Sequence, residues 1–148
     1  MPEKKTIERA RRDKRQGKAP STQAGEFVRE EIEHIRHGKH GARSTKQAIA
    51  IGLSEARRAG VKLPVPKKGE ASEATRHSAK SALKHAGKKP SAKRSRAAEK
   101  ALKREPRAAA SKKALSKQAK SAAKQRTAKS RSAAAKKAAR TRARNKVA

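Results

Sequence analysis

The sequence contains no cysteine, tryptophan or tyrosine, and Phe27 is its only aromatic residue. The absence of cysteine excludes disulfide bonds and thiolate zinc sites. Alanine makes up most of the apolar residues and buries little area, so the material for a core is scarce. No apolar run approaches the ~18 residues that a membrane-spanning helix needs, and the first residues lack the apolar middle of a secretion signal. We therefore expect a cytoplasmic protein that does not insert into a membrane.

Acidic residues are the other scarcity, because only 12 Asp and Glu accompany 44 Lys and Arg, which leaves a net charge of +32. A charge of this size calls for a polyanionic partner. Duplex DNA carries one negative charge per ~1.7 Å of its axis, so this charge would match about 16 base pairs. The charge is uneven: residues 67–148 hold 28 basic and 4 acidic residues, whereas residues 1–66 hold 16 and 8.

Two amphipathic helices are predicted in the first half of the chain. Apolar residues recur at helical spacing over residues 21–37, and Gly38 stands at the position of a C-terminal stop. Ser44 and Gln47 form a capping box that starts a second helix, and Gly60 fits its left-handed end. We predict that the two helices fold back on each other as a hairpin. Its predicted core consists of Phe27, Ile32, Ile35, Ile49, Leu53, Val61 and Leu63.

These signals divide the chain into three predicted segments: a basic N-terminal arm at 1–20, the helical hairpin at 21–63, and a low-complexity tail of Lys, Ala, Ser and Arg at 64–148. The predicted fold class is all-α, a small helical hairpin with a long basic, largely disordered or conditionally helical C-terminal tail. Dense positive charge is expected to oppose helix formation in the tail until phosphates neutralise it. A unit as small as the hairpin is marginal alone, so we also expect a homodimer through the hairpin.

Two resemblances add to this interpretation. The block STQAGEFVREEIEHIRHGKHGARSTKQAIAIGLSEARRAGVKLP, residues 21–64, resembles an uncharacterised family of short basic bacterial proteins that are often labelled plasmid stabilisation or DNA-binding proteins. Residues 67–148 are similar in composition to the Lys- and Ala-rich tails of linker histones and histone-like bacterial proteins. These resemblances imply a DNA-associated role and a location at the nucleoid.

The expected function is non-specific binding of duplex DNA, in which phosphate charge is neutralised and the DNA is compacted or stabilised. We expect no catalysis and no cofactor, because no catalytic grouping or Gly-rich phosphate loop is present. One alternative is a structural protein that binds RNA or the ribosome. Another is a sequence-specific plasmid maintenance factor that places Thr45, Lys46 and Gln47 in the major groove.

The residues expected to contact DNA lie in the loop before the second helix, at its start, and in the acid-free end of the chain. They are Lys39, Arg43, Lys46, Lys112, Lys113, Lys117, Lys120, Lys124, Arg126, Lys129, Arg131, Lys136, Lys137, Arg140, Arg142 and Arg144.

His34, His37 and His40 are spaced by three residues, and Glu30 or Glu31 lies at a helical spacing that would allow it to join His34 as a metal ligand. Imidazoles also stabilise the C-terminal end of a helix through its dipole. We adopt this second interpretation, so no metal is expected from the sequence.

Glu26, Glu30 and Glu33 form an acidic stripe on the first predicted helix. Their expected partners are Arg57 and Arg58 at the end of the second helix. Self-association with a basic segment of another copy is the alternative.

Overall fold

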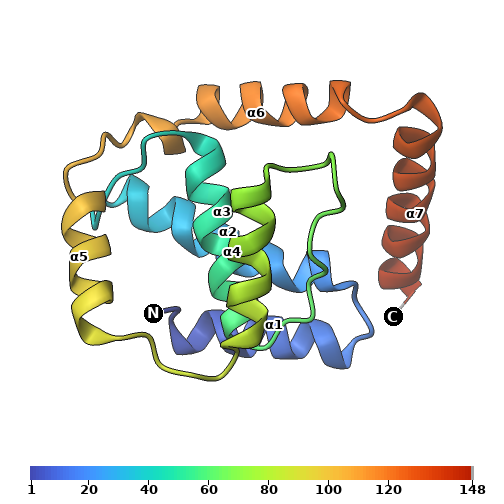
Figure 1. Ribbon diagram of the computed structural model, residues 1–148. Coiled ribbons are helices and arrows are strands. Elements are labelled where there is room, and N and C mark those ends of the chain that lie inside the picture. The colour runs from blue at the N-terminus through green and yellow to red at the C-terminus, as the bar shows by residue number, and fades with distance from the viewer. Residues whose placement is uncertain (148) are drawn as a thin grey trace. The chain divides into compact units, whose positions relative to one another are not determined.

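Helices make up most of residues 1–147, the part of the chain that this computed structural model describes (Figure 1). In chain order they are α1 (Lys4–Arg15), α2 (Pro20–Arg36), α3 (Thr45–Arg58), α4 (Glu73–Lys84), α5 (Ala92–Leu102), the 3₁₀-helix η1 (Ala108–Ala110), α6 (Lys112–Lys124) and α7 (Ala128–Val147). Within these residues there is no strand, and Lys68 and Ala71 form an isolated bridge. The predicted fold class is therefore wrong: the region expected to be a largely disordered tail contains α4, α5, η1, α6 and α7.

The chain divides into two compact units, Met1–Ser111 and Lys112–Ala148. The first unit contains α1 to α5 and η1, and the second contains α6 and α7. No helix within residues 1–147 combines the length and the apolar character that crossing a bilayer requires.

The ends of α2 and α3 lie close to the residues that the sequence predicts. Gly38 follows α2 with a φ of +74°, and Gly60 follows α3 with a φ of +94°, the left-handed conformation that favours glycine. At the start of α3, the Ser44 hydroxyl accepts a hydrogen bond from the Gln47 amide at 3.1 Å. The predicted positions of Gly38, Ser44 and Gly60 are thus confirmed. The start of the first helix is not where the sequence indicated, because Ser21 or Thr22 was expected to cap it, whereas α2 begins at Pro20, whose fixed φ suits the first helical position, and has no side-chain cap.

The core of the first unit is built largely from alanine. Ala10, Ala24, Phe27, Ala56 and Val61 form the buried cluster. The partly buried side chains of Ile7, Leu53 and Leu63 pack against this cluster. Small side chains bury little area each, so such a core requires backbones that approach closely.

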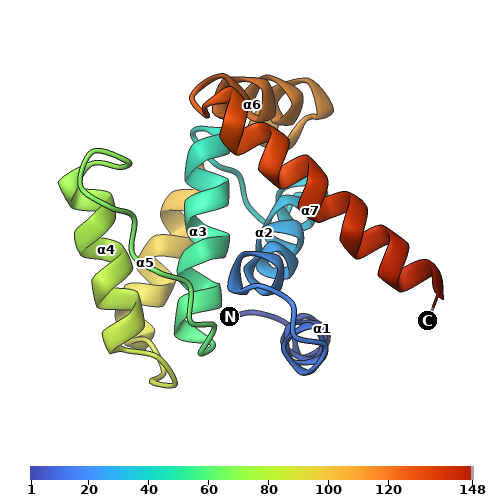
Figure 2. The same cartoon turned by 90° about the vertical axis from the view of Figure 1, so that its right-hand side faces the viewer.

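Gly52 shows how close this approach is. An ideal Cβ at this position would lie 2.6 Å from the Cα of Val28, so only glycine fits where α3 crosses α2. α3 lies between α2 and α4 (Figure 2). Ile49, which was predicted to be in the core, is only half-buried.

The N-terminal segment, expected to be a frayed basic arm, forms α1 and packs against α2. Thr6, Ala10 and Asp13 are its buried residues. The Asp13 carboxylate pairs with Lys18 at 2.7 Å, which ties the end of α1 to the turn before α2.

The first unit extends well beyond residue 63, where the predicted hairpin was expected to end. α4 buries Ala79 and Ala82 and contacts α3, and the Gly87 amide donates to the Arg58 carbonyl at 2.8 Å. Further along, η1 packs on both α2 and α3. The Thr45 hydroxyl donates to the Ala109 carbonyl at 2.7 Å. α4 and η1 are therefore attached to the α2–α3 hairpin, whereas α5 between them buries no residue.

Local capping explains why the basic region is helical. The Ser72 hydroxyl accepts from the Thr75 amide at 3.2 Å at the start of α4. The Thr127 hydroxyl accepts from the Ser130 amide at 3.1 Å where α7 begins. Ala, Lys and Arg are strong helix formers, so these caps and the high propensity outweigh the repulsion between like charges.

Candidate nucleic-acid interface

The second unit, Lys112–Ala148, contains 14 Lys and Arg residues and no Asp or Glu, and we call it the acid-free unit. Every one of these basic side chains is exposed. None of them takes part in an ion pair with a residue of the described chain, since all the ion pairs found there lie at or before Lys103. The first unit, in contrast, contains all 12 acidic residues and has a net charge of +18.

The structure places the predicted contact residues of this unit on two helices and the turn between them. Lys112, Lys113, Lys117, Lys120 and Lys124 lie on α6; Arg126 lies in the turn; Lys129, Arg131, Lys136, Lys137, Arg140, Arg142 and Arg144 lie on α7. Lys146 is a further exposed basic residue of α7 that belongs with this set. Lys146 lies in the same acid-free tract of the sequence as the predicted contact residues, and this position could have identified it as one of them.

Four lysines of α6 lie along one face of the helix. Lys113, Lys117, Lys120 and Lys124 follow one another at intervals of four, three and four residues, the spacing that places side chains on the same side of an α-helix. With a rise of about 1.5 Å per residue, this lysine stripe is about 16 Å long. The half-buried residues of α6 are Ala114, Leu115 and Gln118, which lie on its other side.

α7 is basic on more than one side. Lys129 and Arg140 are eleven residues apart, about three helical turns, and so share one face, whereas Arg131 and Arg142 share another. All four of these residues lie within the single helix α7. A rod with cations on several sides can contact phosphates in more than one orientation, which does not suit reading of one base sequence.

The start of α3 is less open than the sequence suggests. The Thr45 side chain is buried, and its hydroxyl donates to the Ala109 carbonyl at 2.7 Å. The Gln47 side-chain oxygen accepts from the Arg43 amide at 2.7 Å. Lys46 is therefore the one fully exposed member of the three residues expected to face a major groove. Lys39 is exposed but pairs with Glu3 at 3.0 Å, while the Arg43 side chain is exposed.

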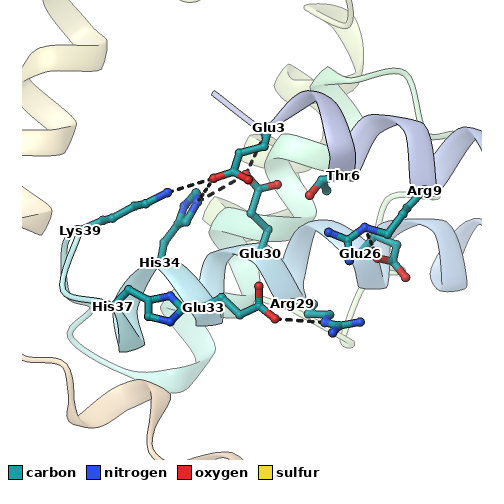
Figure 3. Close-up of a pocket in the computed structure, with 10 residues that line it drawn as sticks. All are labelled: Glu3, Thr6, Arg9, Glu26, Arg29, Glu30, Glu33, His34, His37 and Lys39. Atoms are coloured by element: carbon teal, nitrogen blue, oxygen red, sulfur yellow. Dashed lines mark hydrogen bonds and ion pairs between the residues drawn. The ribbon is translucent and has the colours of Figure 1, made fainter.

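A polar hollow of about 240 Å³ lies between α1 and α2, far along the sequence from the acid-free unit (Figure 3). Its lining residues are Glu3, Thr6, Arg9, Glu26, Arg29, Glu30, Glu33, His34, His37 and Lys39.

The acidic stripe of α2 does not pair with Arg57 and Arg58 as predicted. Glu26 lies 3.6 Å from Arg9, and Glu33 pairs with Arg29 at 3.2 Å. Buried Arg57 instead donates to the carbonyls of Leu63 and Pro64. The prediction failed because the N-terminal segment, expected to be a basic arm, forms α1 and packs against α2, where its Arg9 reaches Glu26.

Two carboxylates, Glu3 in the hollow and Glu55 on α3, have pKa values that are shifted in opposite directions. Hydrogen bonds from Lys39 and His34 lower the pKa of Glu3. Burial raises the pKa of Glu55 to about 6, and the neighbouring carboxylates of Glu31 and Glu30 add to that rise. The ammonium group of Met1, 3.9 Å from Glu55, acts in the opposite direction.

Residues 3–68 match the model of a family described as a family of unknown function, DUF6496. The match covers α1, α2 and α3, less than half of the chain, and it ends before α4 and the acid-free unit. No curated protein and no solved structure matches the chain.

Proposed function

We propose that this protein binds duplex DNA by neutralising phosphate charge, without base-specific reading and without catalysis. The acid-free unit is the principal contact surface, and the nucleoid is the location. The observation that carries the proposal is the set of 14 exposed basic side chains in a stretch of helices that contains no Asp or Glu. Solubility alone does not require so large a charge of one sign.

The lysine stripe gives this surface a defined geometry. Cations at helical spacing along about 16 Å of α6 are presented together, and a helix can approach a row of backbone phosphates without unfolding. Each phosphate contact releases condensed counterions, so the logarithm of affinity falls with the logarithm of salt by about 0.9 per contact. Eight contacts from the acid-free unit would thus contribute about 7 to the slope.

Duplex DNA is preferred to single-stranded nucleic acid because the protein has no aromatic platform on which bases can stack. Phe27 is the only aromatic residue, and it is 1% exposed. The proposal also needs no second copy. The α2–α3 pair expected to form a homodimer is already covered by α1, α4 and η1 of the same chain.

The first test compares the full chain with residues 1–111 in DNA binding at several salt concentrations. Residues 1–111 form a compact unit with its own core, so the truncation removes charge and leaves the hairpin in place. We expect the truncated protein to lose most of its affinity and most of its salt slope. Unchanged affinity and slope would overturn the proposal and move the contact surface to the first unit.

The second test neutralises the lysine stripe by the four substitutions Lys113→Gln, Lys117→Gln, Lys120→Gln and Lys124→Gln. If all four contact phosphates, the slope becomes less steep by about 3.6. The matched control replaces four exposed lysines of the first unit, Lys88, Lys89, Lys93 and Lys100, by Gln. The control should change the slope by less than one.

Competitor nucleic acids address the two alternatives. Equal competition by random duplexes supports non-specific binding, whereas one protected site that survives excess random DNA indicates a sequence-specific plasmid factor. Stronger competition by structured RNA than by duplex DNA at every salt concentration would indicate an RNA- or ribosome-binding protein instead.

A further inference from the structure

Two histidines and two buried glutamates meet beside the hollow between α1 and α2. His34, Glu30 and Glu31 belong to α2, and His40 follows in the loop before α3. The Nε2 atom of His40 lies 3.5 Å from Oε1 of Glu31, and Nε2 of His34 lies 3.5 Å from Oε1 of Glu30. One ligand atom from each of Glu31, His34 and His40 lies within 4.8 Å of the others. We call these three residues the histidine–glutamate cluster.

The hydrogen bond that His40 makes through Nδ1 leaves its other ring nitrogen, Nε2, facing Glu31 as a possible metal ligand. Its Nδ1 lies 3.0 Å from the Gly41 carbonyl oxygen, which can only accept, so Nδ1 donates to this oxygen. In the neutral imidazole, Nε2 then carries a lone pair directed at the Glu31 carboxylate. In that state two acceptors face each other at 3.5 Å, and a metal ion between them would satisfy both. An Nδ1 held by a backbone carbonyl is also the usual support for a histidine that binds metal.

The carboxylates provide an independent observation. Glu31 is 2% exposed and Glu30 is 6% exposed. Oε1 of Glu31 and Oε2 of Glu30 are buried without a hydrogen-bond partner in the described chain. Unpaired buried carboxylate oxygens are costly, and coordination to a cation is one way in which proteins satisfy them.

We propose that Glu31, His34 and His40 bind a divalent transition-metal ion of the zinc type. Two imidazole nitrogens and one carboxylate oxygen form a three-residue set that zinc accepts, with a fourth position left for water or Glu30. Imidazole donors select zinc, nickel or copper over magnesium or calcium.

The distances fit this assignment. Zinc bonds of about 2.0–2.1 Å in a tetrahedron place the ligand atoms about 3.3 Å apart. Within the cluster, the His40–Glu31 separation of 3.5 Å is close to that value, and the other pairs of ligand atoms lie within 4.8 Å. His34 lies 3.5 Å from Glu30, which could fill the fourth position. His34 also forms a second group with Glu3 and Glu30 whose ligand atoms lie within 4.8 Å of one another. Figure 3 shows His34, Glu3 and Glu30 converging at the hollow, so His34 belongs both to the lining of the hollow and to the cluster.

Such an ion would fasten the loop after α2 to the helix itself. The same loop contacts a distant segment, since the Gly41 amide donates to the Leu102 carbonyl at 2.9 Å and the Ala42 amide donates to the Pro106 carbonyl at 3.0 Å. Bound metal therefore stabilises the attachment of residues 102–106. This role is independent of the DNA-binding proposal, because none of the cluster residues belongs to the acid-free unit.

The test uses the full chain, freed of metal by a chelator that is then removed, and titrated calorimetrically with zinc chloride. We expect one zinc ion per chain, no response to magnesium, and a rise of Tm on the order of 5–10 °C at saturating zinc. His40→Gln and Glu31→Gln should each weaken zinc binding at least tenfold. His37→Gln is the matched control, because His37 is exposed and lies outside the cluster; it should bind zinc like the wild type.

A measurement on the unsubstituted protein removes any dependence on how the variants fold. The chain has five histidines, so their imidazole nitrogens can be followed by nuclear magnetic resonance during the zinc titration. Zinc should shift the Nε2 signals of His34 and His40 and leave those of His77 and His85 unchanged. The proposal is overturned if the full chain binds no zinc, if the shifts fall on other histidines, or if folded His40→Gln binds zinc as tightly as His37→Gln does.

Discussion

Replacement of Gly52 by alanine tests the close helix crossing on which the alanine-rich core depends. In an isolated helix, Gly→Ala stabilises by about 1 kcal/mol, because glycine has the greater entropy in the unfolded chain. At Gly52 the new Cβ would lie 2.6 Å from the Cα and 2.9 Å from the nitrogen of Val28. It would also lie 3.1 Å from the carbonyl carbon of Phe27. All of these are backbone atoms of α2, so the two helices must move apart.

The net effect of Gly52→Ala is therefore expected to be a loss of stability. Overpacking of this kind costs roughly 1–3 kcal/mol. Over most of this range the cost is larger than the gain of about 1 kcal/mol from helix propensity. Separation of α2 and α3 also loosens the contacts of Phe27, which is 1% exposed. For a domain of about 100 residues, each kcal/mol corresponds to a change in Tm of roughly 4–8 °C.

Gly25→Ala is the matched control, because Gly25 is an exposed residue of α2 and a Cβ there would meet nothing within 4 Å. This variant should gain about 0.5–1 kcal/mol. The assay is thermal and guanidinium unfolding followed by far-UV circular dichroism. Opposite signs for the two variants are expected. If Gly52→Ala were stabilised as much as Gly25→Ala, the crossing of α2 and α3 would not be as close as described, and the account of the core would fail.

Two further predictions concern the first unit. Because the folded-state pKa of Glu55 is raised to about 6 from an ordinary value of 4.5, the folded protein binds the proton more tightly than the unfolded chain does. The stability that this provides is fully present below pH 4.5 and is lost as the pH rises through 6. Glu55→Gln, measured in a metal-free buffer, should raise the free energy of unfolding by at most about 2 kcal/mol above pH 7 and flatten this pH dependence. Equal pH profiles of the two proteins would refute the burial of Glu55. Gly41→Ala would bring a Cβ against the backbone of Glu105 and Pro106. Residues 102–106 should therefore detach and become sensitive to limited proteolysis. If the variant resisted the protease as well as the wild type does, the close approach of Gly41 to Glu105 and Pro106 would be contradicted.

The ends of α2 and α3 were predictable because the signals that set them are local. A serine hydroxyl within reach of an amide three residues later, or a glycine that can adopt positive φ, acts whatever surrounds the helix. Ser44, Gly38 and Gly60 meet this condition, and each occupies its expected place. Pairing partners are not local, which is why the acidic stripe of α2 was assigned to the wrong arginines.

The basic region was misjudged for two physical reasons. Repulsion between lysines was expected to outweigh helix propensity, yet side chains such as Ser72 and Thr127 begin new helices after short breaks. The apolar content also indicated too little core for a fold that extends past residue 63. A core of alanines stabilises the fold only where the backbones of the helices come close. The close approach of α2 and α3 depends on Gly52, and the sequence alone does not show that another helix packs against this glycine.

The histidine–glutamate cluster was only half visible in the sequence. The helical spacing of Glu31 and His34 places them near each other, and this spacing did suggest a metal ligand pair. The position of His40 depends on the path of the loop after Gly38, and the burial of both glutamates depends on the elements that cover α2. Neither could be derived from spacing along one helix.

The DNA-binding and metal-binding proposals depend on electrostatic interactions that act over different distances. For this reason one strongly basic chain can bind both phosphate groups and a metal cation. Attraction to DNA sums charges that stand many ångströms apart on exposed helices, and salt weakens it over a Debye length of about 8–10 Å. The net charge of +18 on the first unit repels a divalent cation in the same long-range manner. Around Glu31, however, the donor atoms lie within 4.8 Å of one another and the carboxylate itself is buried, so local coordination decides the outcome. The acidic residues are confined to the unit that has a core, where burial can give carboxylates such a role, and they are absent from the helices that would face phosphate.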